Sequence, residues 1–173
     1  MKLMHFSLTT NIAAVFLMSS TLNAGDHDEP GSAVSQAASV TRAVQEFMAA
    51  VARDVTAQGP HAWRKCLSQK HGFFMASNGQ LVFESGEAAQ QGIGALEQTI
   101  ERISLQWGQS LHVDPLNDTL AQVGVPFHET LVEKTGKQLS VDGYFTGLAE
   151  HNEAGWQFRS AHWSVPPGTT VPK

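Results

Sequence analysis

The sequence has a single cysteine, a single tyrosine and no run of basic residues. With only Cys66 present, no disulfide can form within the chain, so buried apolar side chains must stabilise the fold. We expect a buried, inert thiol, although the preceding Arg64 and Lys65 could lower its pKa. The net charge of −5 and the absence of a basic run argue against nucleic acid as a partner. Glycine-rich phosphate loops and nucleophile elbows are also missing.

A long hydrophobic run is missing too. The N-terminal apolar segment Ile12–Met18 is far shorter than the ~20 residues that span a bilayer. Because Lys2 precedes this segment and small polar residues follow it, the pattern predicts a signal peptide over residues 1–24, cleaved after Ala24. The alternative is a retained anchor, which the short run disfavours. We therefore expect a periplasmic or secreted protein whose mature chain does not insert into a membrane.

Residues 25–31 predict a disordered polar tail in front of the domain. If cleavage falls after Ala24, His27 becomes the third residue of the mature chain. A free amine, two backbone amides and that imidazole can bind Cu(II) or Ni(II) in a square plane. A solvated tail without metal is the alternative, and elsewhere the sequence predicts neither a metal nor a cofactor.

The periodicity of the remaining chain predicts an α+β domain over residues 32–166, followed by a C-terminal tail over 167–173. Apolar residues at spacings of three and four predict a long helix from Ser32, and a short helix from Pro60 carries Trp63. Asn78-Gly79 predicts a hairpin turn, and a third helix has Ile93, Leu96, Ile100 and Ile103 on one face. Three long strands follow, over residues 120–133, 137–150 and 155–165. Their short turns predict antiparallel pairing, and thus a curved, mostly antiparallel sheet wrapped around three N-terminal helices.

The order of these elements resembles the NTF2-like superfamily, a cystatin-like α+β group. That superfamily includes the SnoaL-like and DUF4440 groups and the calcium/calmodulin-dependent kinase association domain. The residues that carry the resemblance are Gly59 followed by Trp63, and Gly155-Trp156-Gln157-Phe158 followed by His162-x-Ser164. The resemblance implies a cone with a pocket at its wide end and a homodimer formed through the sheet. It implies no single function, since isomerases, dehydratases, oligomerisation hubs and binding modules share the fold.

Strand alternation predicts which side chains line the cone. Val123, Val125, Phe127 and Leu131 form one inward set, and Leu139, Val141, Phe145 and Gly147 form another. The last strand leaves two phases open, with either Trp156 and Phe158 or Arg159 and Trp163 inward. In the kinase association domain, arginines stand at the positions that the resemblance matches to Phe127, Gly147 and Trp163, so we expect an apolar or aromatic small molecule as the ligand. The predicted ligand-binding residues are Trp63, Leu96, Phe127, Phe145, Gly147, Arg159 and Trp163.

Three interpretations of the function remain open. The first is a binding protein, with open volume and aromatic walls. The second is an enzyme of the isomerase or dehydratase type, which needs a carboxylate or histidine in the cavity for proton transfer. Its catalytic candidates are His162 and the pair Asp142 and Tyr144, although alternation points that pair away from the cavity. The third is an interaction module with a vestigial cavity, filled by contact between Trp63 and Trp163.

Overall fold

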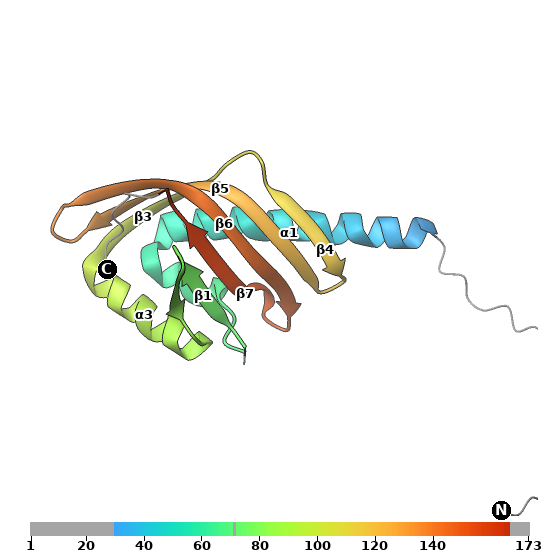
Figure 1. Ribbon diagram of the computed structural model, residues 1–173, viewed down its shortest axis with the longest axis horizontal. Helices are drawn as coiled ribbons and strands as arrows, with labels where there is room; N and C mark the ends of the chain where they lie inside the picture. The colour runs from blue at the N-terminus through green and yellow to red at the C-terminus, as the bar shows by residue number, and fades with distance from the viewer. Residues whose placement is uncertain (1–29, 71, 167–173) are drawn as a thin grey trace, which may run out of the picture.

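The computed structural model describes residues 30–70 and 72–166 (Figure 1). Its helices are α1 (Pro30–Gln58), the 3-10 helix η1 (Gly59–Ala62), α2 (Trp63–Cys66) and α3 (Gly86–Thr99). Its strands are β1 (Phe74–Ser77), β2 (Gln80–Phe83), β3 (Ile100–Trp107), β4 (His112–Asn117), β5 (Leu120–Glu133), β6 (Gln138–Asn152) and β7 (Gly155–Ser164). The strands form one sheet, and the predicted α+β class is confirmed.

The three long strands β5, β6 and β7 lie side by side, as their short turns predict. The strand order is β2-β1-β7-β6-β5-β3, and β4 pairs with β5 as well. Along the outer edge of β5, residues 127–133 pair with β3 and residues 120–124 with β4. The pairing of β1 with β7 is parallel and the other named pairs are antiparallel, which confirms a mostly antiparallel sheet.

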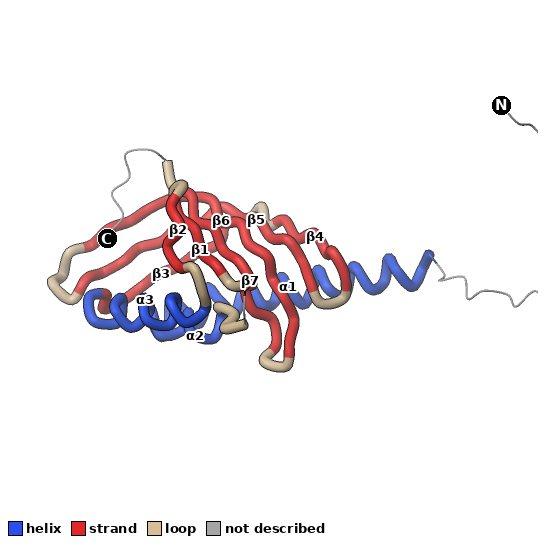
Figure 2. The backbone as a smooth tube through the Cα atoms, turned by 60° about the horizontal axis from the view of Figure 1, so that its bottom comes forward, coloured by secondary structure: helices blue, strands red, loops and turns tan. Residues whose placement is uncertain are grey.

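The helices lie on one side of the curved sheet (Figure 2). On α1, the buried side chains recur at spacings of three and four, as an amphipathic helix requires. They are Val40, Val44, Met48, Val51 and Val55. The half-buried Phe47 joins them, and its ring centroid lies 4.9 Å from that of Phe158 on β7. We call the face of the sheet that the helices cover the inner face, and the opposite face the outer face.

Local sequence signals form the predicted hairpin turn and also begin the third helix. Asn78 and Gly79 both have positive φ, +49° and +79°, which is the backbone of a type I′ turn between β1 and β2. The Ser85 hydroxyl accepts a hydrogen bond from the Ala88 amide at 3.1 Å and caps α3. Gly92, within α3, leaves space for the Phe83 ring, which a Cβ at that position would meet.

The third helix is shorter than its apolar spacing predicts. Ile100 and Ile103 are expected on the helical face, but α3 ends at Thr99 and both isoleucines belong to β3. The prediction is wrong because an irregularity in the pairing of β3 with β5 shifts the strand alternation just after Ile100. Apolar residues at 100 and 103 therefore fit a helix by spacing alone, although both are buried in a strand.

Several predictions fall outside the described part of the chain. Residues 1–29 and 167–173 include the predicted signal peptide, His27 and the C-terminal tail, and α1 begins at Pro30, two residues before the predicted domain start. Among the described residues, no helix combines the length and the apolar character needed to cross a membrane.

Candidate functional site

A β-bulge in the last strand decides which of its side chains face the helices. Opposite β6, Phe158 pairs with Ala149 and Ser160 pairs with Leu148, so Arg159 is the extra residue on β7. The bulge reverses the alternation. As a result, Phe158 before the bulge and Trp163 after it both pack in the core. The strand therefore follows the first predicted phase before Arg159, where Phe158 faces inward, and the second phase after it, where Trp163 faces inward.

Trp163 is the centre of a cluster of aromatic rings on the inner face. Its ring centroid lies 4.7 Å from that of Phe127, 4.9 Å from Phe145, 5.6 Å from Trp63 and 5.8 Å from Trp107. The indole of Trp107 also donates a hydrogen bond to the backbone oxygen of Met48 at 2.8 Å. These rings pack against one another, so the contact between Trp63 and Trp163 that a filled cavity predicts is present.

The other predicted ligand-binding residues lie around this cluster. Gly147 makes room for a neighbour, since a Cβ there would approach the Phe145 ring to 2.9 Å. Arg159, as the bulged residue, is 48% exposed in its side chain, and its guanidinium lies 3.7 Å from Glu150. Leu96 is 39% exposed on α3. The structure thus brings Trp63, Phe127, Phe145 and Trp163 together but places Arg159 apart from them.

Strand alternation also places a carboxylate, that of Glu129, on the inner face. Glu129 lies between Phe127 and Leu131 on β5, and its cross-strand partners are Leu105 and Val141, which are both buried. Within the described residues the carboxylate makes no hydrogen bond or ion pair. Solvent reaches part of the side chain, yet burial raises the pKa of Glu129 to about 7.

Glu129 is absent from the residues predicted from the sequence. The period-two alternation that selects Phe127 and Leu131 also selects Glu129, which lies midway between them. The signal that finds it is an ionisable residue with apolar residues of the same phase on both sides of it. Burial without a partner raises the pKa of a carboxyl group, and residues with shifted pKa values are candidates for functional sites.

Two leucines lie at the end of the inner face that Glu129 approaches, and a third lies on α3, whose C-terminal end contacts the neighbouring β5–β6 turn. Leu131 and Leu139 are cross-strand partners on β5 and β6, half-buried and packed against the core. Leu96 is on α3, and the carbonyl of Thr99 at the end of that helix accepts the Lys134 amide of the β5–β6 turn at 2.9 Å. We call Leu96, Leu131 and Leu139 the apolar rim. Accessible apolar side chains beside one carboxylate suit a small apolar molecule with one polar group.

An ion-paired network fixes α3 against α2. The Arg64 guanidinium donates to both carboxylate oxygens of Glu97 at 3.1 and 3.0 Å, and to the Gln90 backbone oxygen at 3.1 Å. His61 Nδ1 lies 3.1 Å from the same carboxylate. Hydrogen bonding from Arg64 holds the pKa of Glu97 below its ordinary value. Because Leu96 precedes Glu97, this network also positions one side of the apolar rim.

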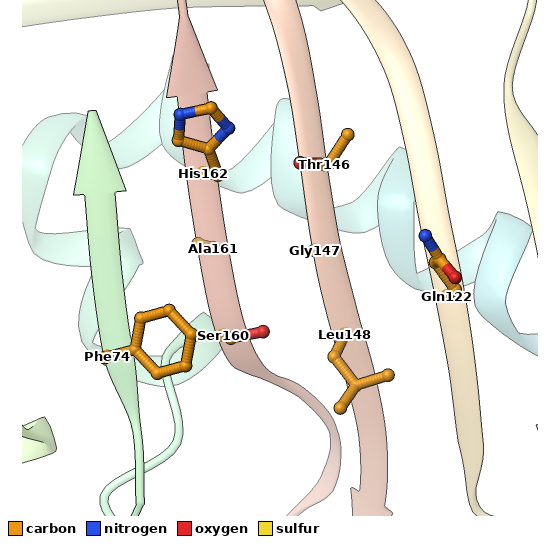
Figure 3. Close-up of a pocket in the computed structure, with 8 residues that line it drawn as sticks. All are labelled: Phe74, Gln122, Thr146, Gly147, Leu148, Ser160, Ala161 and His162. Carbon is orange, nitrogen blue, oxygen red and sulfur yellow. The ribbon is translucent and has the colours of Figure 1, made fainter. Parts of the chain in front are cut away.

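The catalytic candidates predicted from the sequence lie on the outer face. Asp142 and His128 form a pair there, with Oδ1 and Nδ1 2.8 Å apart. The Tyr144 ring packs over Gly124 and is 40% exposed. His162 lies on the same face (Figure 3), because the bulge places Ser160 and His162 opposite the outward residues of β6. The predicted outward direction of Asp142 and Tyr144 thus agrees with the structure, and neither lies beside Glu129.

A hollow of about 230 Å³ lies on the outer face (Figure 3). Its lining residues are Phe74, Gln122, Thr146, Gly147, Leu148, Ser160, Ala161 and His162. Gly147 and Ala161 are cross-strand partners, and because neither has a side chain directed outward, the strand backbone forms the floor. Phe74, from β1, is an apolar wall of this hollow.

Cys66 is buried on α2, and its thiol donates a hydrogen bond to the Ala62 oxygen at 3.4 Å. Burial raises the pKa of Cys66 to about 12, so the thiol stays protonated. The expectation of a buried thiol is confirmed, and the lowering effect of the Lys65 charge on its pKa is outweighed by burial. Across residues 30–70 and 72–166, no three histidine, cysteine, aspartate or glutamate side chains cluster closely enough to hold a metal ion.

No family model and no curated protein matches the sequence. Solved structures match it over most of its length. An NTF2-like superfamily protein from Salmonella enterica serovar Typhimurium aligns with a TM-score of 0.63 at 14% identity, over 79% of this chain and 97% of its own. A protein provisionally assigned as a scytalone dehydratase, from Novosphingobium aromaticivorans, aligns with a TM-score of 0.68 at 9% identity, over 81% and 93%.

A third solved structure connects the chain to the kinase domain that its sequence resembles. This protein from Xanthomonas campestris, provisionally assigned as a calcium/calmodulin dependent protein kinase II association domain, aligns with a TM-score of 0.58 at 16% identity. The match covers 72% of this chain and 86% of that one. At such identities the likenesses establish a shared fold and confirm the resemblance at that level. They leave the function to be argued from the site.

Proposed function

We propose that this protein, which has the NTF2-like fold, binds a small, largely apolar or aromatic molecule at the apolar rim beside Glu129. The observation that carries this proposal is the half-buried, unpaired carboxylate of Glu129 next to partly accessible leucines. The aromatic cluster occupies the inner face behind the rim, so the ligand would contact Leu96 and Phe127 rather than separate Trp63 from Trp163. Apolar surface with one oriented polar group is typical of small-molecule sites.

The test is calorimetric titration with two neutral probes, naphthalenemethanol and octanol, on the wild type and two variants. Leu131→Lys places a charge in the apolar rim, and Val132→Lys places the same charge at the next residue, which faces the other side of the sheet. We expect Leu131→Lys to weaken binding by about tenfold or more and Val132→Lys to change it less than about twofold. Equal losses in the two variants, or no binding by the wild type, would contradict the proposal.

The position of Glu129 also favours a second candidate function, proton transfer to or from the bound molecule. A carboxyl group with a pKa of about 7 in an apolar setting is matched to acid–base work near neutral pH. Nitrobenzisoxazole is a suitable probe, because removal of its carbon-bound proton by a carboxylate breaks the N–O bond and releases a coloured cyanonitrophenolate. We expect the rate to rise with pH through about 7 and to be lost in Glu129→Gln. A rate unchanged by that substitution would exclude Glu129 as the base.

We also propose that the protein is exported and forms a homodimer through its sheet. Export is supported by the charged, then apolar, then small-residue order of residues 1–24. The intact mass of protein recovered from the cell envelope should correspond to a chain that begins at Gly25, and a mass that includes residues 1–24 would contradict export. The dimer is supported by the resemblance and by the outer face, where Phe74 lines the hollow and both Phe74 and Tyr144 are exposed.

A further inference from the structure

Glu129 is the one carboxylate without an ion-pair partner at the described inner-face positions of β5. The inner positions of β5 before it carry alanine, valine and phenylalanine, and Leu131 and Glu133 follow it. Glu133 lies 3.6 Å from Lys137, which balances its charge. The β6 positions that face these residues carry leucine, valine, glycine, phenylalanine and alanine, and those of β3 carry Ile103, Leu105 and Trp107. A ligand at the apolar rim therefore meets one unbalanced charge, and that charge is negative.

No described basic side chain is available to balance this carboxylate. Arg64 is bound to Glu97 and Gln90. Lys134 and Lys137 are exposed in or beside the β5–β6 turn, and Lys137 lies 3.6 Å from Glu133. Arg102 is exposed on β3, opposite Val132 of the outer face. An ionised Glu129 is thus a partly buried charge without a counter-charge in the protein, which is unfavourable until a ligand supplies one.

Aromatic rings lie next to the carboxylate along the sheet. Phe127 precedes Glu129 by two residues on the same face of β5, and Trp107 is the cross-strand partner of Phe127. Two residues along a strand are about 6.6 Å apart, so a cation attracted to Glu129 would lie near these rings, and ring faces stabilise ammonium groups by cation–π interaction. The carboxylate and the rings thus both favour a positively charged group in the ligand.

We propose that the inner site selects a molecule that carries a protonated amine on an apolar or aromatic body. The ammonium group pairs with Glu129 by a charge-assisted hydrogen bond, and the body packs on the apolar rim. A carboxylate ligand would face Glu129 with no basic group between them, so the site rejects anions. This inference rests on the proposed binding function and specifies the class of ligand.

The experiment compares three probes of the same shape by calorimetric titration at about pH 8, where Glu129 is largely ionised. The probes are naphthylmethylamine, naphthalenemethanol and naphthoate, which are cationic, neutral and anionic. We expect the wild type to bind the amine about thirtyfold more tightly than the alcohol, and the anion more weakly than either. Glu129→Gln should remove the preference for the amine over the alcohol, and cooperative urea unfolding of this variant shows that it is folded.

The outcomes separate this inference from the function on which it rests. Equal affinities for the amine and the alcohol in the wild type would overturn the amine selection and leave the proposed function standing. If none of the three probes binds, both are overturned. If Glu129→Gln keeps the preference for the amine, the selection does not come from Glu129 and the inference fails.

Discussion

Burial of Glu129 makes the free energy of unfolding depend on pH. Its pKa of about 7 stands above the ordinary value of 4.5, and a difference of this size corresponds to about 3 kcal/mol. The folded protein therefore binds this proton more tightly than the unfolded chain does. Stability is unaffected below about pH 4.5, falls as pH rises towards 7, and is constant above it. Burial is the cause, with no contribution from a neighbouring titratable group.

Replacing Glu129 with glutamine should therefore stabilise the protein at high pH. We expect Glu129→Gln to raise the free energy of unfolding at about pH 8 by up to about 3 kcal/mol, and to leave it nearly unchanged at about pH 4.5. Urea denaturation at both pH values measures the difference. Glu153→Gln, at an exposed turn, is the matched control and should show no such dependence. A variant that is less stable than the wild type at about pH 8 would show that the carboxylate has a stabilising partner.

At the scale of elements, the bulge at Arg159 determines how β7 contributes to the core. The strand has Phe158 and Trp163 five residues apart, an odd spacing that regular alternation would place on opposite faces. Arg159, the extra residue, turns Trp163 to the same face as Phe158, and Trp163 then contacts the four rings around it. The side chain of Arg159 adds little to this, because it is exposed and forms a single long contact with Glu150.

Deleting Arg159 alone should consequently be tolerated, whereas deleting Arg159 together with Ser160 should not. Without Arg159, Phe158 and Trp163 are four residues apart, and regular alternation places both inward. Without Ser160 as well they are three apart, so one of them must turn outward, and we expect that variant to lose cooperative unfolding and its near-ultraviolet circular dichroism. Arg159→Ala keeps the bulge, and its stability should stay within about 0.5 kcal/mol of the wild type. Thermal melts followed by circular dichroism test the three variants. A double-deletion variant that melts like Arg159→Ala would mean that the phase of β7 is not fixed by its residue count.

At the scale of the whole molecule, the sheet separates two surfaces of different chemistry. The inner face is mainly aromatic and aliphatic and includes the unpaired carboxylate of Glu129, whereas the outer face combines the hollow with polar pairs. These pairs are His128 with Asp142, and Thr130 with Ser140, whose hydroxyl oxygens lie 2.8 Å apart. Ligand binding and association between copies can thus use opposite sides of the same strands.

If the proposed dimer forms through the outer face, a charge in the hollow should disrupt it, and a charge on α3 should not. Leu148→Arg places a charge in the hollow, so we expect this variant to sediment as a monomer under conditions in which the wild type is a dimer. Gln91→Arg, at an exposed position of α3, should leave the dimer intact. Sedimentation velocity distinguishes the two. A wild type that is monomeric, or a Leu148→Arg variant that is still dimeric, would argue against an interface on this part of the sheet.

Much of the architecture follows from the sequence because its signals are local. The spacing from Val40 to Val55 gives the buried stripe of α1, Asn78-Gly79 gives the hairpin, and short turns give the antiparallel order of β5, β6 and β7. Such features depend on neighbours within a few residues, whose conformational preferences act whatever the rest of the chain does. The expected inward direction of Phe127 and Phe145 belongs with them.

Other features were decided only by tertiary structure, because they depend on pairing between distant strands. The bulge at Arg159 exists relative to β6, and the end of α3 at Thr99 reflects the pairing of Ile100 and Ile103 with β5. Alternation alone points Glu129 inward, but its raised pKa comes from burial, alongside apolar partners on β3 and β6. Sequence periodicity fixes the direction of a side chain, whereas the chemistry at that position depends on which strands lie beside it.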